Sequence, residues 1–160
     1  MNLILKTKNA VLLGIFCLSS PFAFADFTGK VIHISDGDTV RVLDSSSIQH
    51  RIRLAGIDAP ESKQAFGTKS KQALAEMIFS KNVYIKEISQ DRYGRTVGQI
   101  YLNNVDINKE MVKGGWAWAY REYLVDKSYV PAEQAAKQKK LGLWADPNPI
   151  YPSQFRHAAK

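Results

Sequence analysis

Short runs of alternating apolar and polar residues dominate the chain after its first 25 residues. They are rich in β-branched side chains and are separated by turn and loop signals, a pattern typical of half-buried strands. Five strands are predicted, over residues 27–34, 39–43, 50–57, 82–88 and 97–102. The turn signal Asp36-Gly37-Asp38 separates the first two, so we expect these two strands to form a hairpin.

Helical patterns lie between and after the strands. A group of apolar residues at helical spacing follows the third strand: Ala73, Leu74, Met77 and Ile78. This spacing predicts a helix over residues 68–79. A second helix is expected from Asp106, a candidate N-cap, to Gly114, a candidate terminator. A third is expected from Pro131, suited to the first helical position, to Gly142.

The order of these elements indicates an α+β, mainly β fold. Five strands with a helix after the third favour a small barrel with helices packed on it, although periodicity alone also allows other α+β arrangements. A chain of 160 residues suits one domain, which we place over residues 26–160. The tail from about residue 145 holds Pro147, Pro149 and Pro152 and is predicted to be irregular.

The first 25 residues have the layout of a secretory signal peptide. Lys6 and Lys8 give a positive start, and residues 10–18 are apolar. Ala23 and Ala25 then form an A-x-A cleavage signal, so we expect cleavage after Ala25 and export, either to a periplasm or out of the cell. The alternative of a membrane anchor is disfavoured, because spanning a bilayer takes roughly 20 apolar residues.

Charge and cysteine content add two constraints. The chain has 22 Lys and Arg against 15 Asp and Glu, a formal net charge of +7, and loss of the two lysines in the predicted signal leaves +5. A positive excess suits a polyanionic partner but excludes little by itself. The only cysteine, Cys17, lies in the predicted signal, so we expect a mature chain without disulfides.

Three segments combine residue types suited to phosphate chemistry: residues 36–39 (DGDT), 53–61 (RLAGIDAPE) and 91–95 (DRYGR). Singly, each is also explained as a turn or a strand end with surface charges. Together they supply carboxylate oxygens, which calcium prefers, and arginines, whose planar guanidinium matches phosphate. A further carboxylate is available to orient or deprotonate an attacking water.

These segments, with the third extended to Tyr101, resemble the three signature segments of the staphylococcal nuclease family in order and spacing. The similarity runs from about Thr28 to Trp144. It implies a five-stranded OB-fold barrel with three packed helices. It also implies an exported, calcium-dependent endonuclease that hydrolyses the phosphodiester bonds of DNA and RNA and leaves 3′-phosphates.

The resemblance also implies roles for the acidic residues. Calcium would be bound by Asp38, by Asp58 and by the backbone carbonyl of Ala59. The family commonly has threonine at this last position, but a carbonyl ligand does not depend on the side chain. Asp36 would lie in the outer shell and reach the metal through water. Glu61 would act on the attacking water, either as a general base or as an orienting group.

The substrate-facing residues implied by the resemblance come from later in the chain as well. Four of them belong to the arginine-containing segments: Arg53 and Arg95 on the scissile phosphate, and Arg92 and Tyr93 beside the nucleotide. An aromatic-rich stretch over residues 115–123 supplies another, for which ungapped matching selects Tyr123, with Tyr120 as a rival. Trp116 and Trp118 in the same stretch are expected to pack in the core.

Two other classes of function stay open at this stage. One is a non-catalytic OB-fold protein that binds single strands through a basic groove and aromatic side chains. The other is an exported protein that binds a different anionic ligand. Both are disfavoured, because every catalytic and metal-binding side chain implied by the resemblance is present. We expect a monomer with no membrane anchor after cleavage of the signal.

The proposed site makes a geometric demand that follows from the residues themselves. Arg53 and Asp58 are five positions apart, so a regular strand would point them to opposite faces. A shared site requires an irregularity or strand exit between residues 55 and 59, and Gly56 is the best candidate for it. Asp38 and Asp58 must also converge, and Glu61 must turn back towards them.

Overall fold

The structure is a computed structural model that describes residues 25–124 and 126–158. Apart from its last residue, the predicted signal peptide over residues 1–25 lies outside this part of the chain. Every helix within the described ranges is too short or too polar to cross a lipid bilayer.

Six strands form one sheet in the order β3-β2-β1-β5-β6-β7. They are β1 (Phe27–Ile34), β2 (Thr39–Asp44), β3 (Gln49–Leu54), β5 (Asn82–Gln90), β6 (Thr96–Leu102) and β7 (Val105–Asp106). A parallel pairing of β3 with β6 closes the sheet into a five-stranded barrel, and β7 extends β6. The short strands β4 (Ile57–Asp58) and β8 (Trp118–Ala119) pair separately.

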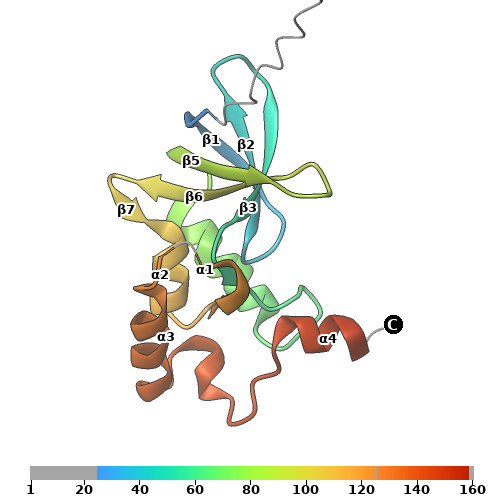
Figure 1. The fold of residues 1–160 in the computed structure, drawn as a ribbon, viewed down its shortest axis with the longest axis vertical. Helices are drawn as coiled ribbons and strands as arrows, with labels where there is room; N and C mark the ends of the chain where they lie inside the picture. Colours follow the sequence, from blue (N-terminus) through green and yellow to red (C-terminus); the bar gives the residue numbers. More distant parts are fainter. Residues whose placement is uncertain (1–24, 125, 159–160) are drawn as a thin grey trace, which may run out of the picture.

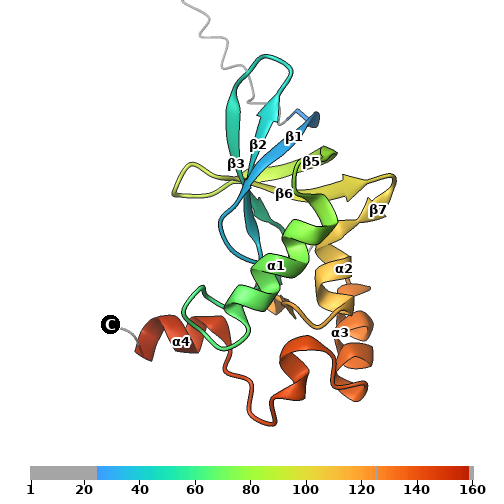
Figure 2. The same cartoon turned by 180° about the vertical axis from the view of Figure 1, so that it is seen from behind.

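The helical elements within the described residues are α1 (Gly67–Ile78), α2 (Ile107–Lys113), α3 (Tyr129–Gln138) and α4 (Pro152–Ala158), with 3-10 turns η1 (Arg121–Tyr123) and η2 (Gly142–Ala145). The barrel occupies one end of the molecule, while α2 and α3 gather at the other and α4 projects to one side (Figure 1). The reverse view shows α1 running diagonally from the barrel towards α4 (Figure 2). The predicted α+β fold, an OB-type barrel with three packed helices, is confirmed.

The prediction of an irregular tail from residue 145 is wrong for residues 152–158, which form α4. Pro152 is the first residue of this helix and is buried. Proline is well suited to that position, because its fixed φ matches the helix and its missing N–H would have had no partner there. Pro147 and Pro149 lie before α4, outside any regular element.

The helix ends agree with the local signals at α2 and differ from them at α3. The Asp106 side chain accepts a hydrogen bond from the Lys109 backbone N–H at 3.0 Å, and Gly114 is the C-cap, so both predicted ends of α2 are confirmed. Helix α3 ends at Gln138 rather than at Gly142, because the chain turns at Lys140, which has a φ of 52°. It begins at Tyr129 rather than at Pro131. A proline is accommodated there, because the N–H groups of the first turn have no partner within the helix.

The core lies between the barrel and the helices. Its largest fully buried aliphatic side chains include those of Ile52, Leu54, Leu74, Ile85, Ile100 and Met111. A second cluster surrounds Trp118, whose ring centroid lies 5.3 Å from that of Trp144 and 5.4 Å from that of Tyr151. Trp118 is therefore a core residue, as expected, and Trp116 is partly buried against the main core.

Candidate active site

One cavity of about 830 Å³ collects every site residue that the sequence analysis selected. Its lining includes all nine of them, Asp38, Arg53, Asp58, Ala59, Glu61, Arg92, Tyr93, Arg95 and Tyr123, together with Asp36 and Tyr120. These residues come from the β1–β2 turn, the end of β3 and the segment after it, the β5–β6 hairpin and the stretch around η1. The fold thus brings four distant sequence segments to a single place.

The β1–β2 turn holds its two aspartates through local hydrogen bonds and a close approach to α1. The Asp38 backbone N–H donates to Asp36 Oδ1 at 3.0 Å. A Cβ at Gly37 would lie 1.9 Å from Ser70 Oγ and 2.8 Å from the Cβ of Ala59, so glycine is required here by space. Ser70 is completely buried and donates to the Trp116 carbonyl, which leaves it no room to move.

The segment after β3 leaves the barrel as the site requires. Strand β3 ends at Leu54, Gly56 has a φ of 72°, and residues 57–58 pair with β8 instead. The predicted break between residues 55 and 59 is therefore confirmed. Asn108 of α2 supports it, because its buried side chain donates to the Ala55 carbonyl at 3.0 Å and to the Gly98 carbonyl at 3.1 Å.

The break places Arg53 and both candidate metal-binding aspartates at one point. Arg53 Nη2 lies 3.2 Å from Asp38 Oδ2 and 3.3 Å from Asp58 Oδ1, although the aspartates are twenty positions apart. Asp38 Oδ2 also accepts the Ala59 backbone N–H at 2.8 Å. Asp38 and Asp58 therefore both lie against Arg53, as a shared site requires.

The carboxylates beside Arg53 are buried and close to one another. Asp38 is 7% exposed and Asp58 is 1% exposed. Burial and the neighbouring Asp38 charge raise the pKa of Asp58, against the opposing effect of Arg53. Burial and Asp38 likewise raise the pKa of Asp36 to about 6. Crowded, desolvated carboxylates of this kind supply the hard oxygen donors that calcium prefers.

The side chains at this place therefore supply only some of the ligands that a calcium ion needs. Two carboxylates converge, but in the described residues no group of three or more His, Cys, Asp and Glu side chains is arranged to hold a metal. The third ligand implied by the resemblance is a backbone carbonyl, that of Ala59, and the contact seen at this residue is made by its N–H. The calcium site, and Ala59 in it, stay predictions.

The β5–β6 hairpin presents its two arginines around an exposed tyrosine. Asp91 Oδ1 accepts the backbone N–H groups of Tyr93 and Arg95, both at 2.9 Å, and Gly94 takes the expected left-handed conformation at a φ of 73°. Asp91 Oδ2 accepts from Arg95 Nε at 2.6 Å. The Tyr93 ring is 64% exposed and lies 5.0 Å from the Arg92 guanidinium carbon and 5.6 Å from that of Arg95.

The two rival tyrosines lie side by side. The ring centroids of Tyr120 and Tyr123 are 4.9 Å apart in an edge-on arrangement. Tyr123 is 63% exposed, whereas Tyr120 is half-buried and its N–H donates to the Gly56 carbonyl. Both reach the cavity, so each is placed to contact a nucleotide, and the structure does not separate them.

A fourth arginine in the cavity, Arg156, was not predicted from the sequence. Arg156 of α4 has Nη1 at 2.6 Å from Glu61 Oε1, and its Nη2 lies 3.4 Å from Asp58 Oδ2. It lies outside the stretch that resembles the family, which ends near Trp144, and in a tail predicted to be irregular. No local signal points to it, because it meets Asp58 from 98 positions away.

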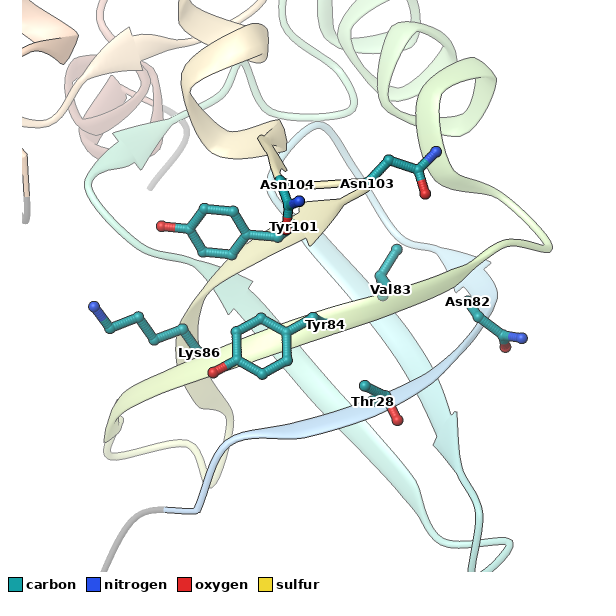
Figure 3. Close-up of a pocket in the computed structure, with 8 residues that line it drawn as sticks. All are labelled: Thr28, Asn82, Val83, Tyr84, Lys86, Tyr101, Asn103 and Asn104. Atoms are coloured by element: carbon teal, nitrogen blue, oxygen red, sulfur yellow. The ribbon is translucent and has the colours of Figure 1, made fainter.

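A second cavity, of about 590 Å³, lies on the outer face of the barrel. Figure 3 shows its lining, with the rings of Tyr84 and Tyr101 and the Lys86 side chain on strands β5 and β6. No carboxylate lines it, and none of the residues selected from the sequence does. Its residues do not match the chemistry of phosphodiester hydrolysis, which leaves the first cavity as the candidate active site.

Known proteins resemble the chain over most of its length. A family model described as staphylococcal nuclease homologue matches residues 51–146. A protein of Haemophilus influenzae named as an uncharacterized endonuclease is 46% identical over 149 residues, which cover 93% of this chain and 84% of that one. A micrococcal nuclease of Shigella flexneri is 42% identical over 171 residues, covering 100% and 98%. With the barrel and the assembled cavity, these matches show that the chain belongs to the staphylococcal nuclease family.

Proposed function

We propose that this family member is an exported, calcium-dependent endonuclease that hydrolyses phosphodiester bonds of DNA and RNA and leaves 3′-phosphates. Membership of a nuclease family supports the general activity. The observation that carries the proposal is the meeting of Arg53 with Asp38 and Asp58 in one cavity, with both nitrogen–oxygen distances at or below 3.3 Å. This arrangement combines a candidate cation site with a phosphate-binding group.

The cavity residues divide the chemistry between them. Asp38 and Asp58 would hold the calcium ion, which when bound supplies Lewis-acid polarisation of a phosphate oxygen. Arg53 and Arg95 would donate to the non-bridging oxygens, where negative charge builds in the transition state. Glu61 would orient the attacking water or accept its proton. Tyr93, with Arg92, Tyr120 and Tyr123, would line the path of the nucleotide.

Substrate binding would exchange the partners of these arginines. Arg53 contacts Asp38 and Asp58, and Arg95 contacts Asp91. Phosphate and carboxylate oxygens offer similar acceptors to a guanidinium. A phosphate entering the cavity would therefore take over hydrogen bonds that carboxylates now accept.

Export and product chemistry rest on the sequence and the resemblance alone. The positive start, apolar run and A-x-A signal of residues 1–25 support export. Export and the formation of 3′-phosphate products are both proposals.

A cleavage assay tests the proposed function. Supercoiled plasmid, single-stranded DNA and RNA are incubated with the purified protein in calcium, in magnesium and in excess chelator, and the ends are identified by mass spectrometry. We expect cleavage of all three in calcium, 3′-phosphate and 5′-hydroxyl ends, and no reaction in chelator. Binding without cleavage would favour the non-catalytic OB-fold alternative, and neither binding nor cleavage would exclude both.

A further inference from the structure

Helix α4 is held over the active-site cavity by contacts at its start. Gln64 Nε2 donates to the Ile150 carbonyl at 2.5 Å, which ties the approach to α4 to the segment that follows Glu61. Tyr151 packs its ring against those of Trp118 and Tyr120, and Pro152 is buried. The helix is therefore anchored at its first turn, and its last turn carries Arg156 to the cavity.

Arg156 contacts the two acids that the mechanism uses most directly. Its Nη1 donates to Glu61 Oε1 at 2.6 Å and lies 3.5 Å from Asp58 Oδ1, while its Nη2 lies 3.4 Å from Asp58 Oδ2. The guanidinium thus spans the gap between the candidate metal ligand and the residue that acts on water. This is the place where the scissile phosphate and its attacking water would meet.

The exposure of Arg156 and Glu61 argues against a purely structural ion pair between these two side chains. The side chains of Arg156 and Glu61 are 43% and 37% exposed. Ion pairs that open to water contribute little to stability, because solvent screens the charges and two long side chains lose freedom. The pair is also open on one side to the cavity, so an incoming anion would meet the guanidinium without unfolding α4.

The two arginines that the proposed function assigns to phosphate indicate what such a pairing means. These arginines, Arg53 and Arg95, both contact carboxylates as well. Arg156 repeats this arrangement through its contacts with Glu61 and Asp58. A guanidinium presents two parallel N–H groups that suit either carboxylate or phosphate oxygens.

We propose that Arg156 is a third phosphate-binding arginine of the active site. On substrate binding it exchanges Glu61 and Asp58 for a non-bridging phosphate oxygen of the nucleic acid. The exchange also frees Glu61 to contact water and Asp58 to contact the cation. This inference rests on the proposed function and extends it to a residue outside the part of the chain that resembles the family.

Binding of a nucleotide that the protein cannot cleave tests the proposal. The probe is thymidine 3′,5′-bisphosphate in calcium, which carries two phosphates but no phosphodiester bond, with the 3′- and 5′-monophosphates for comparison. Arg156→Ala should weaken bisphosphate binding by about tenfold, the usual effect of losing a hydrogen bond to a charged group. Of the two monophosphates, only one should bind more weakly to Arg156→Ala than to the wild type. Arg156→Lys keeps the positive charge but not the two parallel N–H groups, so its dissociation constant should lie between those of the wild type and Arg156→Ala.

The control is Arg51→Ala, which removes an equal charge from an exposed position of β3 and should leave the dissociation constant unchanged. The inference would be overturned if Arg156→Ala bound the bisphosphate as tightly as the wild type or more tightly. A lower melting temperature of the variant, or tighter calcium binding by it, would not change that conclusion. A wild-type protein that neither binds the bisphosphate nor cleaves DNA would instead refute the proposed function.

Discussion

Space around a single glycine determines how the first two aspartates are presented. Gly37 lies between Asp36 and Asp38, and its φ is not in the left-handed region that favours glycine. It is required because the backbone passes against Ser70 of α1, whose Cβ would lie 2.9 Å from an added Cβ. The spacing of the aspartates is thus coupled to the packing of a helix more than thirty positions later.

Gly37→Ala should therefore destabilise the protein and disturb the site. Overpacking of a tight site usually costs about 1–3 kcal/mol, and here the clash displaces the turn that carries Asp38. Urea unfolding and calcium titration measure the two effects. Gly94→Ala is the comparison, because its added Cβ meets no atom within 4 Å and costs only the strain of a φ of 73°. A Gly37→Ala protein as stable as the wild type, with unchanged calcium affinity, would contradict this account.

We expect the loss of the Arg53 side chain to affect turnover more than folding. Arg53→Ala should lower kcat/KM by about a hundredfold or more, since it removes charge stabilisation from the transition state. The chain should stay folded in calcium, because the cation would offset the repulsion between the two aspartates that Arg53 now bridges. Steady-state kinetics and circular dichroism check this, with Arg51→Ala on the same strand as the matched control. Turnover within twofold of the wild type would remove Arg53 from the mechanism.

Helix α2 connects the barrel to the active-site break through one side chain. Asn108 accepts the Ile100 backbone N–H at 3.1 Å and donates to the carbonyls of Ala55 and Gly98. All of its polar atoms are thus used inside the protein, where water does not reach them. The exit of the chain after β3 is therefore supported by a helix that lies some fifty positions further along.

Asn108→Ala should destabilise the fold by about 2–4 kcal/mol, because it leaves buried backbone groups without partners. Denaturant unfolding measures this loss. Asn148→Ala changes an exposed position, so its free energy of unfolding should lie within about 0.5 kcal/mol of that of the wild type. The Asn108→Ala protein should also lose turnover, since Arg53 and Asp58 share the segment that Asn108 holds. A change smaller than that of Asn148→Ala would refute the role assigned to this helix.

At the scale of the whole molecule, the cavity gathers Asp36, Asp38, Asp58 and Glu61, whose like charges repel in the absence of a cation. Calcium with thymidine 3′,5′-bisphosphate should raise the melting temperature, because both bind only the folded chain. A ligand at a hundred times its dissociation constant adds about 2.7 kcal/mol to the free energy of unfolding. Thermal melts with and without chelator measure the shift, and Asp58→Asn should abolish it. Identical melting curves would argue against an assembled site.

Local sequence patterns determined the elements and several of their ends. Alternation predicted all five barrel strands, the Asp106 and Gly114 signals predicted the ends of α2, and Gly56 predicted the break after β3. These features depend on the conformational preferences of residues and their near neighbours, which are present in any short segment. The three signature segments likewise predicted which residues line the cavity.

Tertiary structure alone decided the contacts between residues far apart in the chain. Three such contacts have no local signal, because each depends on where helices pack on the barrel: Gly37 with Ser70, Asn108 with Ala55, and Arg156 with Glu61. Helix α4 also depended on tertiary structure. Pro147, Pro149 and Pro152 predicted an irregular tail, yet Pro152 is the first residue of the helix. Local preferences are set by a few neighbouring residues, whereas the partners of Arg156 are set by the packing of the entire chain.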